Sequence, residues 1–472
     1  MRISRLMAAA VTSLSIAAVS AVPAAVGGTA VAATASASSS IVLRPGAVHA
    51  HGVSESPPTT AFCEQNFKIS CYQPAQIQRA YNLAPLLRRG IDGRGQTIVI
   101  VDSFGSPTIR HDLAVFDKTF HLPAPPSLKV VQPAGPVPRY DPASSAARGW
   151  AGETTLDVEW AHTMAPGARI LLVETPVAET EGPVGFPQIV TAEKYVINHH
   201  LGGVISQSFS ATEQTFPSAA SLLALRGAYV DAAHHGVTML AASGDSGAAD
   251  LEFNQSTYYL HPATTWPDSD PLVTGIGGTQ LHLDADGART APDNVWNDTY
   301  DLATNQFASG STGPNPLASG GGKSVIFARP SYQDGVRGVV GGRRGVPDIS
   351  MSAACNGGVD TYQSFGGMAA GWYPTCGTSE ATPLFAGVVA LAGQVARHWL
   401  GVINPALYEL SARRAPGIVD VTRGNNTVSF TQDGKLHTVR GFRARRGYDL
   451  ASGVGTVNAA TFVFELAALA GH

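Results

Sequence analysis

Reactive side chains stand in three short motifs whose spacing suggests nucleophilic catalysis. The first is Cys376-Gly377-Thr378-Ser379, a turn that opens into an apolar run predicted to be a helix. We expect Ser379 and Pro383 in the first turn of that helix, where a missing N–H is tolerated. The N–H groups and the dipole of a helix N-terminus stabilise a nearby oxyanion. Ser379 is therefore a candidate nucleophile, and the plainer alternative is that it only caps the helix.

Two carboxylates, Glu153 and Asp157, are four residues apart on a second predicted helix and so lie on one helical face. Like charges at this spacing destabilise a helix, which makes a solvated face the simple alternative. Large apolar neighbours such as Trp160 make this helix more apolar than a surface helix. Coupled carboxylates share a proton, and the member with the raised pKa can act as a base. We expect Glu153 to accept the Ser379 hydroxyl proton while Asp157 orients it.

A third acid, Asp245, follows a predicted buried strand in the turn Ser-Gly-Asp-Ser-Gly at residues 243–247. A protonated carboxyl group at this edge of a sheet could donate its O–H to a developing oxyanion. The alternative is a turn-forming residue that hydrogen-bonds its own loop.

The elements that must position these residues alternate between strand and helix. Apolar runs predict strands at 97–102, 168–174, 203–206 and 237–242, and helical spacing occurs at 74–87, 153–162, 187–199 and 218–235. Continuous β-branched runs are typical of strands buried on both faces of a parallel sheet. We therefore predict a doubly wound α/β sheet in one large domain, with active groups at the carboxyl ends of strands. Residues 280–325 are rich in Gly, Asn, Asp, Thr and Pro and predict a long surface excursion.

The N-terminus has the features of a secretory signal peptide, assigned here to residues 1–32. Arg2 and Arg5 precede an apolar core, and small residues follow at candidate cleavage sites. A membrane anchor is disfavoured because Pro23 and glycines interrupt the apolar stretch. Residues 33–70 predict a short flexible extension, and residues 71–472 a single folded domain. We expect a secreted, extracellular protein with no membrane association in its mature form.

Composition excludes some partners and bears on the cysteines. The 472 residues carry a net charge of −4 with 44% hydrophobic residues and no basic run, so we expect no nucleic-acid binding. Export favours disulfides among the four cysteines, and the economical pairing is local: Cys63 with Cys71 and Cys355 with Cys376. Three connectivities remain possible from sequence. A Cys355–Cys376 bridge would pin the loop that enters the Ser379 turn.

Together and in order, these motifs resemble those of the sedolisin family of serine-carboxyl peptidases, which share the subtilisin fold. The resemblance runs from about residue 74 to 458 and includes residues 165–168, 273–279, 319–330 and 344–350. It implies a subtilisin-like fold with helices on both faces of the sheet. It also implies that Ser379 is the nucleophile, Glu153 the general base, Asp157 its partner and Asp245 the oxyanion-stabilising acid.

The same resemblance implies one structural Ca²⁺ ion bound by two loops near the C-terminus. Asp420 and Asp449 would supply side-chain oxygens, and Val421, Arg445 and Gly447 backbone carbonyls. Arg445 stands where the family often has glycine, so we expect its backbone to need a conformation that glycine adopts more easily. The alternative is two polar turns without a metal.

Two other departures from the family pattern matter. Only about thirty residues separate the predicted signal peptide from Cys63, so we expect the usual large activation prodomain to be lacking. In the strand expected to line the specificity pocket, Phe209 stands for Trp or Tyr and Ser210 for Gly. The preference for the residue before the scissile bond therefore does not carry over.

We predict an acid-active endopeptidase, or a tripeptidyl exopeptidase, that acts on protein or peptide substrates as a monomer. Two alternatives remain open. One is a conventional subtilisin that uses Asp102, at the end of the first core strand, with His111 or His162. The other is a non-catalytic binding protein on the same fold.

Overall fold

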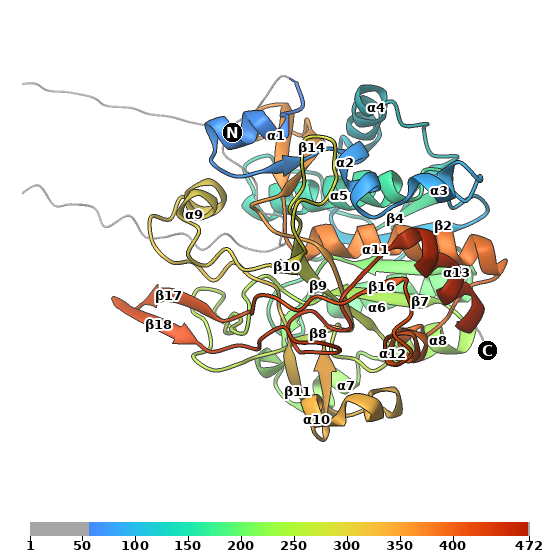
Figure 1. Cartoon of the computed structure of the whole chain (residues 1–472). Coiled ribbons are helices and arrows are strands. Elements are labelled where there is room, and N and C mark those ends of the chain that lie inside the picture. Colours follow the sequence, from blue (N-terminus) through green and yellow to red (C-terminus); the bar gives the residue numbers. More distant parts are fainter. Residues whose placement is uncertain (1–55, 471–472) are drawn as a thin grey trace, which may run out of the picture. The chain divides into compact units, whose positions relative to one another are not determined.

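A parallel β-sheet organises the part of the chain that this computed structural model describes, residues 56–470 apart from the side chains of residues 307 and 308 (Figure 1). Among these residues eight strands form the main sheet in the order β10-β9-β7-β5-β2-β4-β3, with β13 also beside β9. They are β2 (Thr97–Ser103), β3 (Leu128–Val131), β4 (Arg169–Thr175), β5 (Val204–Gln207), β7 (Thr238–Ala242), β9 (Thr274–Gln280), β10 (Asn294–Val295) and β13 (Ile349–Ser352). Within this eight-stranded sheet, β9 and β10 pair antiparallel and all other neighbouring strands pair parallel.

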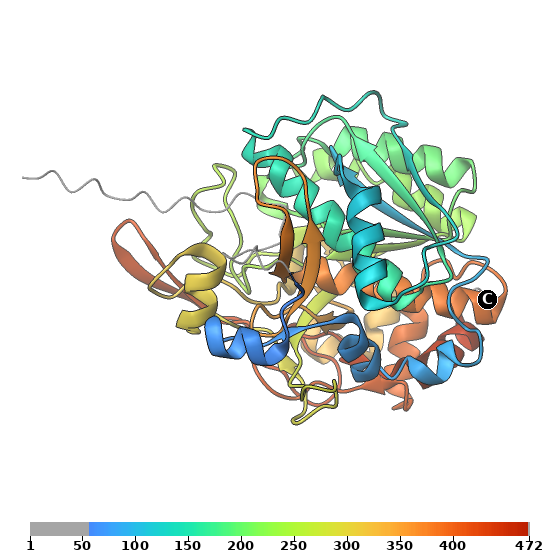
Figure 2. The same ribbon diagram turned by 90° about the horizontal axis from the view of Figure 1, so that it is seen from above.

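Helices cover both faces of this sheet, as predicted. One face packs against α5 (Ser145–Met164) and α11 (Thr378–Ala396), on which α4 (Ile109–Phe120) and α13 (Ala459–Leu469) pack in turn. The other face packs against α6 (Phe186–Asn198) and α8 (Gly227–His235). Figure 2 shows the green helices of the second face across the sheet from the orange α11. Strand β2 explains the two layers, because Ile98 and Ile100 enter the first core and Val99 and Val101 the second.

The remaining helices and strands lie outside the main sheet and the six helices named above. They are α1 (Thr60–Asn66), β1 (Cys71–Tyr72), α2 (Pro74–Ala80), α3 (Ala84–Leu87), β6 (Ala211–Thr212), η1 (Glu213–Thr215), α7 (Ala219–Leu223), β8 (Thr265–Trp266), α9 (Leu302–Ser309), β11 (Gly322–Ala328), η2 (Ser331–Val336), α10 (Arg337–Val340), β12 (Arg343–Val346), β14 (Gly358–Gln363), β15 (Gly371–Thr375), α12 (Asn404–Ala412), β16 (Ile418–Val419), β17 (Val428–Gln432), β18 (Lys435–Val439) and β19 (Thr456–Val457). The described residues belong to one compact unit, so the single-domain prediction is confirmed for them. Within residues 56–470, no helix is long and apolar enough to cross a membrane.

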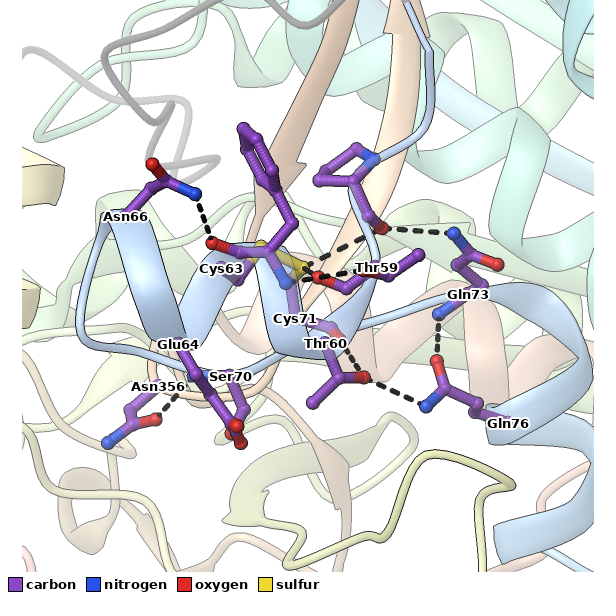
Figure 3. The surroundings of a disulfide bond; sticks show 12 residues. Thr59, Thr60, Cys63, Glu64, Asn66, Ser70, Cys71, Gln73, Gln76 and Asn356 are labelled. Atoms are coloured by element: carbon purple, nitrogen blue, oxygen red, sulfur yellow. Dashed lines mark hydrogen bonds between the residues drawn. A yellow bond between two sulfur atoms is a disulfide. The ribbon is translucent and has the colours of Figure 1, made fainter.

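The first helix of the described residues, α1, begins before residue 71, the predicted start of the folded domain. The predicted signal peptide and residues 33–55 of the predicted extension lie outside the described residues, but α1 falls inside that extension. A Cys63–Cys71 disulfide ties α1 to β1, and the Thr60 hydroxyl donates to the Cys71 carbonyl at 2.8 Å (Figure 3). Strand β1 in turn pairs with β14, so this N-terminal segment is part of the folded domain.

Two other expectations need correction. The helix predicted at 218–235 is two helices, α7 and α8, with residues 224–226 between them. The predicted surface excursion at 280–325 is partly internal, because β10 joins the main sheet and Trp296 is fully buried. Its Gly- and Asn-rich composition misled the prediction, since these residues form tight turns against the core.

Candidate active site

Ser379 is the second residue of α11, in the first turn as predicted. The turn that presents it is held from the side of the sheet. Gly377, at φ +117, donates its N–H to the Ala353 carbonyl at 2.8 Å. A Cys355–Cys376 disulfide closes the same turn, so the local cysteine pairing is confirmed for both bridges. The nucleophile candidate therefore sits on a braced helix N-terminus.

Pro383 is the sixth residue of α11, so its predicted place in the first turn is wrong. A residue at this position normally donates its N–H to the carbonyl four residues earlier, here that of Ser379. Proline cannot, and the Ser208 hydroxyl lies 3.3 Å from the Ser379 carbonyl oxygen as its replacement donor. Because of Pro383, the Ser379 carbonyl is free to accept a hydrogen bond from Ser208, the residue that follows β5 (Val204–Gln207).

Ser208 also connects the serine to the carboxylate helix. Its hydroxyl lies 2.8 Å from Asp157 Oδ1, and its own carbonyl oxygen lies 3.4 Å from Ser379 Oγ. Helices α5 and α11 pack directly against each other. Glu153, one turn before Asp157 on α5, is fully buried in the same layer.

The carboxylates on this side of the site are buried close together. Burial raises the pKa of Asp157 well above its usual value, and the charges of Asp102 and Glu153 raise it further, against the Ser208 hydrogen bond. Burial likewise raises the pKa of Asp102 to about 7, opposed by Thr154. Because like charges oppose each other's ionisation, this group holds protons well into the mildly acidic range.

Asp245 contacts Thr378, the residue before the serine. Its Oδ1 accepts hydrogen bonds from both the N–H and the hydroxyl of Thr378, each at 2.7 Å. The turn that carries Asp245 fits tightly, since a Cβ at Gly320 would lie 1.7 Å from the Ser243 carbonyl oxygen. This orients the Asp245 carboxyl group at the N-terminus of α11.

Hydrogen bonds thus connect two predicted site residues, Asp157 and Asp245, to the helix end that carries the third, Ser379. Ser208 links Asp157 to Ser379, Glu153 lies one turn away on α5, and Asp245 holds the preceding Thr378. The histidines do not support the conventional subtilisin alternative. Buried His162 pairs with Asp117 at 3.2 Å, and within the described residues no hydrogen bond or ion pair joins a histidine to Asp102 or Ser379.

Sequence reasoning missed the role of Ser208 and treated Asp102 only as a possible triad residue. Both stand at the carboxyl ends of strands, β5 and β2, which pair side by side. That position was a usable signal, because such ends meet at one edge of a parallel sheet.

The two loops predicted to bind calcium do meet. The N–H of Gly447 donates to Asp420 at 2.9 Å, and that of Arg445 donates to Asp449 at 2.9 Å. Arg445 does not have a positive φ, so the expectation that its backbone needs a glycine-like conformation is wrong. Within residues 56–470 no group of three or more His, Cys, Asp or Glu could hold a metal ion. The predicted set contains only two carboxylates, completed by the Val421, Arg445 and Gly447 carbonyls, and this all-oxygen donor set fits Ca²⁺.

Comparisons with known proteins identify the family of this chain. Residues 146–407, over half of the chain, match the Subtilase family. Kumamolisin from Bacillus sp. (strain MN-32) is 31% identical over 400 residues, covering 83% of this chain and 63% of kumamolisin. Tripeptidyl-peptidase 1 of Homo sapiens is 29% identical over 328 residues, covering 66% of this chain and 51% of the human protein. The chain therefore spans less than two thirds of the length of these relatives.

A solved structure shows the same fold. It is described as Pseudomonas sedolisin (serine-carboxyl proteinase) complexed with two molecules of pseudo-iodotyrostatin. The two structures superpose with a TM-score of 0.69 at 25% sequence identity, covering 85% of this chain and 99% of the other.

Proposed function

Because the chain belongs to the subtilase family, and within it to the sedolisins, we propose that it hydrolyses peptide bonds as an acid-active serine-carboxyl peptidase. One observation carries the proposal. Ser208 joins Asp157 to the backbone of Ser379, while Asp245 holds Thr378 from the other side. A hydroxyl group, buried carboxylates and an oriented carboxyl group thus converge on one helix N-terminus.

In the first half-reaction Ser379 Oγ attacks the carbonyl carbon of the scissile bond and Glu153 takes the hydroxyl proton. A C–O bond forms, and the carbonyl π electrons move onto the oxygen. Neutral Asp245 donates its O–H to that oxyanion, assisted by the positive end of α11. The C–N bond then breaks, and Glu153 passes its proton to the leaving amine, which leaves an acyl group on Ser379.

The second half-reaction repeats these roles with water. Glu153 takes a proton from water as the water oxygen attacks the acyl carbon. Collapse of the second oxyanion breaks the bond to Ser379 Oγ, which regains a proton from Glu153. Asp157 stays neutral in acid because its pKa is raised by burial, so it does not oppose ionisation of Glu153. Activity then requires a protonated Asp245 and an ionised Glu153, which coexist best below neutrality.

Cleavage of a mixed peptide library from pH 3 to 8 tests this function. The wild-type protein should cleave with a maximum below pH 7. Ser379→Ala and Glu153→Gln should each lose activity by several orders of magnitude. Ser206→Ala is a matched control, because the buried Ser206 hydroxyl on β5 has no hydrogen-bond partner among the described residues. Products also distinguish internal cleavage from tripeptide release. A maximum above pH 8, or full activity in Ser379→Ala, would refute the proposal.

One structural Ca²⁺ ion is part of this proposal. Asp420 and Asp449 with the carbonyls of Val421, Arg445 and Gly447 would hold it and tie the two loops together. An ion that binds only the folded chain raises the midpoint of thermal unfolding. We expect EDTA to lower that midpoint in protein first shown by elemental analysis to contain calcium, and Asp420→Asn to weaken the effect. An unchanged midpoint in such protein would argue against the assignment.

We also propose export of the protein. Two disulfides support an oxidising compartment. The N-terminal residues 1–32 have the composition of a signal peptide. Expression with and without residues 1–32 in a secretion-competent host tests this, because only the longer form should reach the medium.

A further inference from the structure

A cavity of about 360 Å³ lies beside the site, at the carboxyl ends of β2 and β4. Its walls come from the turn after β2, the loop before α5, and Glu174 near the end of β4. The volume is within the range of sites that bind small molecules or side chains. None of the four predicted catalytic residues lines it.

Glu174 is the buried polar group of this cavity. Its side chain belongs to a residue only 8% exposed, and Oε2 accepts one hydrogen bond, from Gln132 Nε2 at 2.7 Å. Among residues 56–470 no other hydrogen bond and no ion pair to this carboxyl group is found. Burial raises the pKa of Glu174, and the Gln132 hydrogen bond opposes the rise. A largely buried carboxyl group with a single donor from the protein can accept further hydrogen bonds from a ligand in the cavity.

The turn after β2 is shaped around this carboxyl group. Phe104 has φ +62, a conformation unusual for a bulky residue, and Gly105 donates its N–H to the Ser103 carbonyl at 2.6 Å. A Cβ at Gly105 would lie 2.0 Å from Glu174 Oε1, so only glycine leaves space for the carboxyl oxygen. Unusual backbone conformations of this kind gather at ligand sites.

The cavity adjoins the strand that carries Asp102 and the helix that carries Glu153 and Asp157. Glu174 pairs in register with Asp102, whose charge acts on Asp157. Ala147 lines the cavity and precedes Glu153 by six residues on α5, a separation of about 9 Å along the helix axis. About three residues of extended peptide span the same distance.

We propose that this cavity is a subsite for a basic side chain, arginine or lysine, of the peptide substrate. The cationic group would bind the Glu174 carboxylate, and its methylene stem would lie along the rings of Phe104 and Tyr140. Charge supports a cation over an anion, since Arg139 and Asp141 in the lining are both exposed and opposite in charge, and the buried charged group of the lining is the Glu174 carboxylate. This subsite rests on the proposed peptidase function, whose substrate preference it specifies.

Paired fluorogenic peptides test the subsite. The two members are identical except for arginine or its uncharged analogue citrulline, placed in turn at each position from four residues before to four after the scissile bond. We expect kcat/KM for the arginine peptide to exceed that for citrulline by about tenfold or more at one position. In Glu174→Gln the ratio should fall towards one. Glu409→Gln, an exposed glutamate on α12, is the matched control and should keep the wild-type ratio.

A binding measurement separates this proposal from the function on which it rests. Catalytically inactive Ser379→Ala protein is titrated with the arginine and citrulline peptides, with and without Glu174→Gln. Tighter binding of the arginine peptide that depends on Glu174 supports the subsite even if no peptide is cleaved. Tyr140→Ala, on the loop before α5, provides a second variant and should reduce the same difference. Equal binding and equal cleavage of the two peptides, or a preference retained in Glu174→Gln, would overturn the subsite and leave the peptidase proposal standing.

Discussion

Replacing Asp298 with asparagine should remove part of a pH-dependent loss of stability. Asp298 is buried outside the catalytic group, and its Oδ2 accepts hydrogen bonds from Trp296 Nε1 at 2.8 Å and the Cys355 N–H at 2.9 Å. Burial raises its pKa to about 7, with the charge of Asp301 adding to the rise and these donors opposing it. Asparagine can accept the same hydrogen bonds through its carbonyl oxygen but does not ionise.

The sign of the effect follows from proton linkage. In the unfolded chain an aspartate titrates near pH 4, whereas folded Asp298 keeps its proton to about pH 7. Between these values only the unfolded state loses the proton, so the stability contributed below pH 4 is lost as pH rises through this window. A difference of about three pKa units corresponds to about 4 kcal/mol of unfolding free energy for this one group.

Urea unfolding at pH 4 and pH 7, followed by tryptophan fluorescence, measures the loss. A Ser379→Ala background prevents self-digestion in both proteins. We expect unfolding free energy to fall from pH 4 to pH 7, and to fall by about 3 kcal/mol less in Asp298→Asn, because each state is half ionised at one end of this interval. Asp286→Asn is the control, because its side chain is 82% exposed and should leave the pH dependence unchanged. An identical pH dependence in Asp298→Asn and its parent would show that Asp298 does not titrate differently in the folded and unfolded states.

Two further predictions concern the turn that carries the nucleophile. Ser208→Ala should lower kcat about tenfold with a smaller effect on KM, because it removes a donor shared by Asp157 and the Ser379 carbonyl. It should also shift the acid limb of the pH profile. Steady-state kinetics that match those of Ser206→Ala would contradict this. Replacing Cys355 and Cys376 with serine together should cost about 3 kcal/mol, from a bridge that spans 21 positions, and should lower activity. Unchanged urea unfolding would show that the bridge adds nothing.

Local pattern predicted the elements that carry the site. The run at 97–102 predicted β2 because continuous β-branched residues are typical of a strand buried on both faces. The start of α11 was predicted from Gly377 and the apolar residues that follow Ser379. Pro383 was misplaced because the position of a residue within a helix depends on where the first turn closes, which sequence sets only to within a few residues.

Contacts that depend on strand order could not be predicted in the same way. Ser208 and Asp102 become neighbours of Asp157 only because β5 lies next to β2 in the sheet, an order that departs from the order along the chain. Helix α1 was missed because a short segment rich in polar residues has little helix signal of its own. It is held instead by the Cys63–Cys71 bridge and by the hydrogen bond from Thr60 to Cys71.

Trapping Ser379 as a covalent adduct shows whether this serine is the nucleophile and whether it reacts in acid. A peptide aldehyde labelled with ¹³C at the carbonyl is added to the protein at pH 4, and the carbon is observed by NMR. Addition of the Ser379 hydroxyl to the aldehyde gives a tetrahedral hemiacetal, which is recognised as a protein-bound signal separate from those of the free aldehyde and its hydrate. We expect this signal in the wild-type protein at pH 4 and its loss in Ser379→Ala. A hemiacetal that persists in Ser379→Ala, or that forms in the wild type only above neutral pH, would contradict it.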